Sequence, residues 1–148
     1  QKERGKSKME KDCGMWINIL SHKLMKRMNA DLQTLGLTGV QSRLIHFVLT
    51  KSAAGPVFQR DVEAAFGLSR STVTGILQLM EKNGLILRES AENDGRLKSL
   101  VLTEKAVCLH EQVGEYLRRN EARLIQGLSD EQLAQFLETA ARMSANLD

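Results

Sequence analysis

The spacing of apolar residues divides the chain into a series of helices with one interruption. A first helix is predicted from Asp12 to Leu35, because apolar residues recur there every three or four positions, as on one face of a helix. Gly36 ends this helix, and Thr38 with Gln41 at the third helical position has the spacing of a capping box that begins the next. The apolar stripe of the first helix consists of Ile17, Leu20, Leu24, Met28 and Leu32, widened by Trp16, Ile19 and Met25. Because one neighbouring helix cannot cover so wide a stripe, we expect it to be buried on two sides.

Two shorter helices joined by a tight turn follow. The second helix closes at residues 53–56, a third is predicted over 59–66, and a fourth runs from Ser69 as N-cap to the C-cap signal at 83–84. Gly67 lies between the third and fourth helices and tolerates the positive φ that a sharp turn requires. The inward-facing residues are expected to be Val62, Ala65 and Phe66 in the third helix and Val73, Ile76, Leu77 and Met80 in the fourth. This arrangement predicts a helix-turn-helix.

After Gly84 the apolar period changes from 3.6 to 2. Leu85 and Leu87 alternate with Ile86 and Arg88, and Leu100 and Leu102 alternate with Ser99 and Val101. The polar segment 90–95 between them carries Asn-Asp-Gly. The pattern predicts a β-hairpin directly after the helix-turn-helix. The fold class is therefore mainly α with a small β-hairpin wing, a winged helix-turn-helix with further helices on both sides.

Two more helices are predicted at the C-terminal end. Thr103 caps the first, over about 104–127, in which Cys108 is expected to lie in the core. Ser129 with Gln132 forms a second capping box for the last helix. Its apolar stripe continues to the end of the chain and comprises Leu133, Phe136, Leu137, Ala140, Met143 and Leu147. Because a terminal helix this apolar would remain wet in a monomer, it predicts a protein partner.

Composition and charge narrow the choice of class. At 148 residues the chain fits one domain with a core, and it has no apolar run of about 18 residues that could cross a membrane. Its two cysteines suit a reducing, cytoplasmic location. The net charge of +3 is uneven: residues 1–11, five basic and two acidic, carry +3 and are expected to be a disordered basic tail, whereas 55–103 carry six of each sign. DNA binding would therefore depend on where individual cations point, not on a basic field.

The polar face of the fourth helix carries the functional signal. A helix face kept for solubility would carry Glu and Lys pairs, but this one holds hydroxyls and an amide beside an N-terminal Arg70, with the small Gly75 at its centre. Such short donors and acceptors suit the reading of base edges in a major groove. The plain alternative is an ordinary amphipathic helix of an all-α domain.

With these elements in place, the chain resembles the MarR family of bacterial transcription regulators over about residues 12–147. The resemblance is carried by the run GLSRSTVTGILQLMEKNGLILR and by Asp94-Gly95-Arg96, which precedes the Leu-Thr-Glu helix start at 102–104. Ala106 stands where the family commonly has Gly, and Leu97 where many members have a basic or polar residue, so the wing is less basic than usual.

The resemblance implies a homodimer on double-stranded DNA. Residues 12–54 and 104–148 would form the dimerisation helices of a single domain spanning 12–148, and 55–103 the DNA-binding lobe. The resemblance implies contacts in the major groove for the recognition helix and in the minor groove for the Arg96 guanidinium, held by Asp94. The candidate DNA-binding residues are Gln59, Arg60, Ser69, Arg70, Ser71, Thr72, Thr74, Gln78, Arg88, Asp94, Arg96 and Lys98, of which Gln59, Arg60, Arg88 and Lys98 would touch phosphates. A two-fold dimer implies a pseudo-palindromic promoter site, and repression is the expected outcome.

Regulation is expected through a small anionic or aromatic effector, as the resemblance implies. His22, Arg43 and His46 are candidates to bind it if the first two helices face a cleft. Cys13 lies where oxidant-sensing relatives place a reactive thiol, which leaves open a redox-sensing regulator, although a spare thiol is the simpler interpretation. The histidines lack the spacing of a metal site, and no cofactor is expected.

The sequence also bears on two other classes of function, an enzyme and a protein-binding module. The chain lacks a phosphate-binding loop, a nucleophile elbow, an HExxH sequence and a paired-carboxylate signature, so it is not expected to be an enzyme. A winged-helix dimer acting through protein contacts, such as an anti-repressor, remains the alternative because residues 55–103 are neutral overall.

Overall fold

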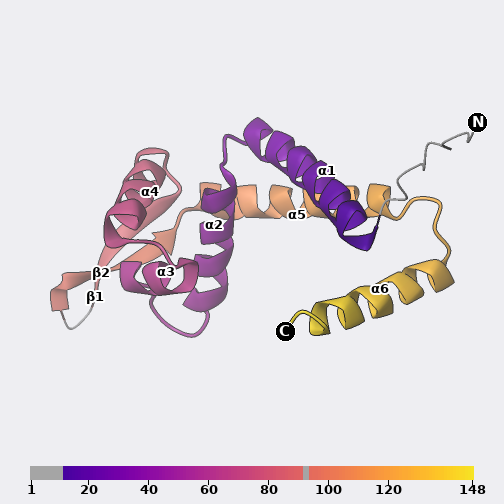
Figure 1. Cartoon of the computed structure of the whole chain (residues 1–148). Coiled ribbons are helices and arrows are strands. Elements are labelled where there is room, and N and C mark those ends of the chain that lie inside the picture. The colour runs from indigo at the N-terminus through magenta and orange to yellow at the C-terminus, as the bar shows by residue number, and fades with distance from the viewer. Residues whose placement is uncertain (1–11, 92–93) are drawn as a thin grey trace, which may run out of the picture.

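The computed structural model describes residues 12–91 and 94–148, and it describes their side chains except at 91, 94 and 95. Within these residues the chain forms six helices and one hairpin (Figure 1). The helices are α1 (Cys13–Thr34), α2 (Gly39–Ser52), α3 (Gln59–Phe66), α4 (Arg70–Lys82), α5 (Glu104–Leu124) and α6 (Asp130–Ala145). The strands are β1 (Ile86–Ala91) and β2 (Asp94–Leu102), which pair antiparallel. This confirms the predicted fold class. The predicted basic tail, residues 1–11, lies outside the described residues.

The predicted capping residues begin the helices. Thr38 Oγ1 accepts a hydrogen bond from the Gln41 amide at 3.2 Å, and the Gln41 side chain accepts one from the Thr38 amide at 3.1 Å. Ser129 and Gln132 make the same reciprocal pair at the start of α6. These bonds satisfy backbone donors that have no partner within the first turn, so local sequence sets where α2 and α6 begin.

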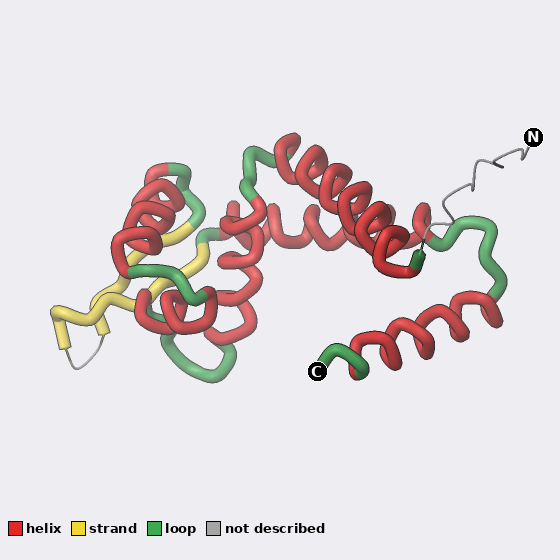
Figure 2. Tube along the Cα trace, viewed as in Figure 1, coloured by secondary structure: helices red, strands yellow, loops and turns green. Residues whose placement is uncertain are grey.

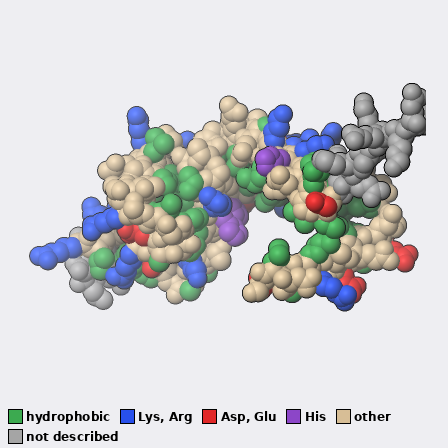
Figure 3. Space-filling model, viewed as in Figure 1, with side chains coloured by type: hydrophobic (Ala, Val, Ile, Leu, Met, Phe, Trp, Pro, Cys, Tyr) green, Lys and Arg blue, Asp and Glu red, His purple; other side chains and the backbone are tan. Residues whose placement is uncertain are grey.

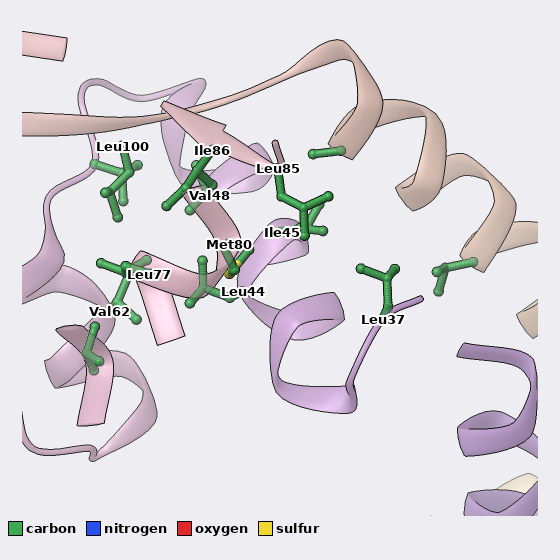
Figure 4. Packing of buried hydrophobic residues seen from close by; sticks show 14 of the residues in the cluster. Leu37, Leu44, Ile45, Val48, Val62, Leu77, Met80, Leu85, Ile86 and Leu100 are labelled. Atoms are coloured by element: carbon green, nitrogen blue, oxygen red, sulfur yellow. The ribbon is translucent and has the colours of Figure 1, made fainter. Parts of the chain in front are cut away.

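The hydrophobic core lies in the winged-helix half of the chain. Figure 4 shows α2 in the middle of this core, with the fourth helix and the hairpin packed against it. The fully buried large side chains are Leu44, Ile45, Val48, Val62, Val73, Leu77, Met80, Leu85 and Ile86. The predicted inward stripe of α4 is confirmed, with Val73, Leu77 and Met80 buried and Ile76 partly buried.

The hairpin is anchored to the helices at its base. Phe58 pairs with Ser99 in an isolated bridge, and the Leu100 amide donates to the Val57 carbonyl at 2.7 Å. This extra pairing joins the start of α3 to β2. The strands run from Ile86 to Ala91 and from Asp94 onward, so residues 90, 91, 94 and 95 of the predicted polar segment 90–95 belong to the strands.

Helices α1 and α5 lie side by side and form a second part of the molecule (Figure 2). A polar cluster joins them, in which the buried Asn120 amide donates to Asp31 Oδ2 at 2.8 Å and accepts from Arg27 Nε at 3.4 Å. Arg119 Nη2 lies 3.2 Å from the other oxygen of Asp31. We call Arg27, Asp31, Arg119 and Asn120 the α1–α5 clamp. It sets the register between two helices whose apolar contact is incomplete.

Much apolar surface stays uncovered in the single chain. No residue of α6 is buried, and this helix stands away from the body of the molecule in Figure 1. On α1, only Leu32 is buried, so the predicted burial on two sides is not achieved within one chain. The exposed large apolar side chains of these helices and of the α5–α6 region are Met15, Trp16, Ile17, Leu24, Met25, Leu117, Leu124, Leu128, Phe136, Leu137 and Leu147.

Two predictions about burial were wrong. Ala65 is exposed, because α3 turns only Val62 and, in part, Phe66 toward the core. Cys108 is also exposed, since the inner face of this part of α5 is supplied by Ala106 and Val113. Helix α5 ends at Leu124, three residues before the predicted end at Gly127, which has a φ of 83°. In the part of the chain that the structure describes, no helix is long and apolar enough to cross a membrane.

Candidate nucleic-acid interface

Helix α4 presents a polar face opposite its buried stripe. Ser69 caps the helix, accepting a hydrogen bond from the Thr72 amide at 3.2 Å. The side chains on the outer face are Arg70, Ser71, Thr72 and Gln78, which are exposed, and Thr74, which is partly buried. Gly75 is exposed among them, and a Cβ placed there would meet nothing within 4 Å. The outer face therefore has hydrogen-bonding groups at its start and an open surface at its middle, so another molecule can approach the backbone closely.

Three hydroxyls gather at the start of α4. Ser69 Oγ lies 3.1 Å from Ser71 Oγ and 2.9 Å from Thr72 Oγ1. The free amides of a helix N-terminus lie beside these hydroxyls, and together they suit an anion such as a phosphate oxygen. The Arg70 side chain, exposed at the first helical position, adds a positive charge to this end.

Gln59 connects α3 to α4. Its Nε2 donates to Thr74 Oγ1 at 2.9 Å and to the Arg70 carbonyl at 3.3 Å. Both amide hydrogens are thereby used within the protein, which leaves the amide oxygen as the group that could meet a partner. Phosphate oxygens only accept hydrogen bonds, so in this arrangement Gln59 has no donor for the phosphate contact that the sequence suggested.

The wing carries the remaining candidate cations. Arg96 and Lys98 are exposed on β2, with Leu97 between them. Arg60 is exposed on α3, and its Cζ lies over the Phe58 ring, 5.1 Å from the ring centroid. Figure 3 shows Lys and Arg side chains gathered around the wing end of the molecule. The Asp94 side chain, predicted to hold Arg96, lies outside the described residues.

Arg88 has a partner inside the protein. Its Nε makes an ion pair with Glu81 Oε1 on α4, and both side chains are partly exposed. The pair ties β1 to the last turns of α4. A phosphate contact by Arg88 would therefore compete with Glu81, a cost that the sequence did not reveal.

The end of α4 is attached to the start of α5. Thr103 Oγ1 donates to the Gly84 carbonyl at 2.6 Å and caps α5 by accepting from the Ala106 amide at 3.2 Å. Lys105 Nζ donates to the Asn83 carbonyl at 2.8 Å. Sequence reasoning recognised Thr103 only as a cap and missed Lys105. The available signal was the C-cap at 83–84, whose last carbonyls need donors.

The three candidate effector residues do not line one cavity. A hollow of about 630 Å³ beside His22 is lined by residues of α1 alone, namely Ser21, His22, Met25, Lys26, Asn29, Ala30 and Gln33. Arg43 is exposed on α2. His46 Nδ1 lies 3.1 Å from Nε2 of His110 on α5, and the two rings stack with centroids 5.3 Å apart. His110 was not singled out from the sequence, because 64 residues separate it from His46.

Cys13 is exposed at the first residue of α1, where Asp12 caps the helix. Among residues 12–91 and 94–148, no group of three or more His, Cys, Asp or Glu side chains is arranged to hold a metal ion.

Comparison with known proteins identifies this arrangement. The model of the MarR family matches residues 35–97, from the end of α1 to the wing. The crystal structure of the transcription regulator MarR from Oenococcus oeni is 30% identical, with a TM-score of 0.60, over 90% of this chain and 99% of that one. The structure of a MarR family transcriptional regulator from Clostridium acetobutylicum is 24% identical, with a TM-score of 0.77, over 90% and 96% of the two chains.

A third relative, MepR from S. aureus, shares the fold. In its complex with DNA it superimposes with a TM-score of 0.78 at 22% identity, over 91% of this chain and 99% of MepR, and it has also been solved bound to ethidium bromide. The Oenococcus relative is similar enough over its whole length to establish kinship beyond the shared fold. The chain belongs to the MarR family of DNA-binding winged-helix transcription regulators, which are not enzymes.

Proposed function

We propose that this chain acts as a homodimeric repressor that binds a pseudo-palindromic promoter site. The observation that carries the proposal is the outer face of α4, which is largely exposed and rich in hydroxyls, while Val73, Leu77 and Met80 on the opposite face are buried. A helix with this division suits insertion into a major groove, where hydroxyls, amides and Arg read base edges. The proposed base-reading and capping residues are Ser69, Arg70, Ser71, Thr72, Thr74 and Gln78.

The wing complements α4 in this proposal. Arg96 would enter the adjoining minor groove, where narrow A·T tracts concentrate negative potential, with Asp94 orienting it. Arg60, Arg88 and Lys98 would neutralise phosphates. MepR, which shares the fold, has been solved in complex with DNA, and this supports a DNA-binding use of the same architecture.

The second copy is proposed to cover the apolar surface of the terminal helices. In proteins most of the stability of a helix comes from packing of its apolar face, and no residue of the 16-residue α6 is buried in the single chain, so we infer that a partner covers it. Phe136 and Leu137 are 56% and 58% exposed, and burying the remaining surface of each in a dimer would contribute about 1–1.5 kcal/mol. We therefore assign dimerisation to helices within 12–54 and 104–148 and DNA reading to 55–103, with α2 packed against both α5 and the hairpin.

An effector is proposed to modulate DNA binding. A small aromatic or anionic effector is expected, and MepR has been solved with ethidium bromide, an aromatic cation, which supports the aromatic alternative for this chain. His22, Arg43 and His46 remain the candidate residues. Because they do not share a cavity in one chain, a joint site would require the surface of the second copy.

The proposal is tested by measuring mass and DNA binding together. Sedimentation of the purified protein is expected to give a dimer. Fluorescence anisotropy with duplexes selected from a randomised library is expected to show sequence-selective binding that weakens steeply with salt, as counterion release requires. Leu137→Glu is expected to yield monomers and to lose most of this binding, whereas Gln135→Glu, the same charge change on an exposed residue of the same helix, is expected to do neither.

Two outcomes would contradict the proposal. A wild-type protein that sediments as a monomer would remove the basis for a two-fold site. A dimer that selects no duplex sequence would favour the alternative in which the winged helix acts through protein contacts.

A further inference from the structure

The bridge from Gln59 to α4 has a fixed direction. The Arg70 carbonyl is 3.3 Å from the Gln59 amide group and can only accept a hydrogen bond, so the atom facing it must be the NH2 nitrogen. The same nitrogen lies 2.9 Å from Thr74 Oγ1 and gives its second hydrogen there. Thr74 is therefore the acceptor in this bond.

The hydroxyl hydrogen of Thr74 consequently has to go elsewhere. In a helix, a threonine commonly donates to the carbonyl four residues earlier, as Thr50 does to His46 O at 2.8 Å. For Thr74 that carbonyl belongs to Arg70, which already receives the Gln59 amide. Within the described residues Thr74 makes no such bond, so its hydroxyl can donate to a molecule facing α4.

We propose that Gln59 is a positioning residue that makes Thr74 a hydrogen-bond donor toward DNA, and so sets base preference at one position in each half-site. The inference rests on the proposed function, in which α4 enters the major groove. There, guanine O6 and N7, adenine N7 and thymine O4 accept hydrogen bonds, whereas cytosine presents only the donor N4. A Thr74 hydroxyl committed to donating can therefore bond to G, A or T and selects against C.

Four substitutions separate this role from a plain backbone contact. Gln59→Glu replaces the amide by a carboxylate that only accepts, so Thr74 must donate to it and turn its oxygen outward as an acceptor. Gln59→Met keeps the length of the side chain but removes the donor, which frees Thr74 to bond to its own helix. Thr74→Val removes the hydroxyl at nearly constant volume. Gln78→Met is the matched control, an amide removed from the exposed surface of the same helix.

Selection of bound duplexes from a randomised library, followed by sequencing, reads the base preference at every position at once. For the wild type we expect one position per half-site with a high ratio of G, A and T to C. Gln59→Met and Thr74→Val should each lower that ratio by about fivefold or more at this position and leave the others unchanged. Gln59→Glu should shift the preference toward C and A, whose amino groups donate to the outward oxygen, and any uniform weakening from its added charge cancels in the ratio. Gln78→Met should alter a different position.

Three results would overturn the inference. The first is an unchanged base preference in Gln59→Met or Thr74→Val variants that retain wild-type melting and dimer mass. The second is a Gln59→Met variant that weakens binding to all sequences equally, as a backbone contact would. The third is a Gln59→Met substitution that still changes base preference when added to Thr74→Val, since a residue acting through Thr74 has no effect without it. A wild-type protein that selects no sequence would instead refute the proposed function itself.

Discussion

The α1–α5 clamp makes a quantitative prediction about stability. Asn120→Leu removes the amide that donates to Asp31 at 2.8 Å and leaves one carboxylate oxygen without this donor. Asn120 is 8% exposed and the Asp31 side chain 18%, so water replaces the lost bond poorly. A hydrogen bond to a charged group contributes about 1.5–3 kcal/mol. The added apolar carbon of leucine returns roughly 1 kcal/mol of this, so we expect a net loss of about 0.5–2 kcal/mol.

The ion pair within the clamp supplies the comparison. Arg119 also reaches Asp31, at 3.2 Å, but its side chain is 61% exposed. Ion pairs of this kind contribute only about 0–1 kcal/mol, because water screens them and two long side chains must be ordered. Arg119→Met keeps most of the aliphatic stem and removes the charge. It should therefore destabilise the protein less than Asn120→Leu does.

Thermal unfolding followed by circular dichroism at one fixed protein concentration tests this ranking. For a chain of this size, 1 kcal/mol corresponds to about 2–4 °C, so Asn120→Leu should lower Tm by about 1–8 °C, with a central value of roughly 4 °C. In a double-mutant cycle, Asn120→Leu and Asp31→Ala should show a coupling energy of at least about 0.5 kcal/mol. If Arg119→Met lowers Tm as much as Asn120→Leu does, the buried amide is not what holds α1 to α5. The same conclusion follows if the effects of Asn120→Leu and Asp31→Ala on stability simply add.

Three further substitutions test the turn, the reading helix and the wing. Gly67 has a φ of 61°, so Gly67→Ala should lower stability by about 1–2 kcal/mol in urea titrations without any clash, and a neutral result would mean that the turn relaxes freely. Gly75→Ala should instead raise helix stability by about 0.5–1 kcal/mol and weaken DNA binding, because the new methyl lies on the face that approaches the duplex. Melting and anisotropy are measured on the same sample, and a variant that is more stable but binds DNA as well as the wild type would contradict this placement. Arg96→Ala should weaken specific binding by about 1–3 kcal/mol at a stated salt concentration with an unchanged Tm, and equal affinity for the selected duplex would exclude Arg96 from the interface.

Local patterns in the sequence predicted most of the secondary structure. The capping pairs Thr38–Gln41 and Ser129–Gln132 begin their helices as expected. Helix α3 has the predicted bounds, and the change of period after Gly84 marks the hairpin. These signals act over no more than about four residues, because capping bonds and helix faces are set by near neighbours along the chain. They are readable without knowing how the elements pack.

The individual contacts at the candidate interface were less predictable. Gln59 was expected to touch phosphate, but the structure places both of its hydrogens on α4. His46 was a candidate to bind an effector together with His22 and Arg43, and its stacking on His110 was not foreseen. Each of these contacts joins residues more than ten positions apart. Their partners depend on how two helices approach each other, which the periodicity of either helix alone does not specify.

The sequence by itself determined which elements form, where they begin, and that α4 has a polar face, charged only at its two ends, opposite an apolar one. Only the tertiary structure decided which polar groups on that face are already satisfied, that Cys108 and Ala65 are exposed, and that α6 buries nothing within one chain. The physical reason is the separation along the sequence over which each kind of interaction acts. Helix and strand formation depends on neighbours within a turn or two, whereas the burial and hydrogen-bond partner of a side chain depend on segments that the fold brings together from distant parts of the sequence.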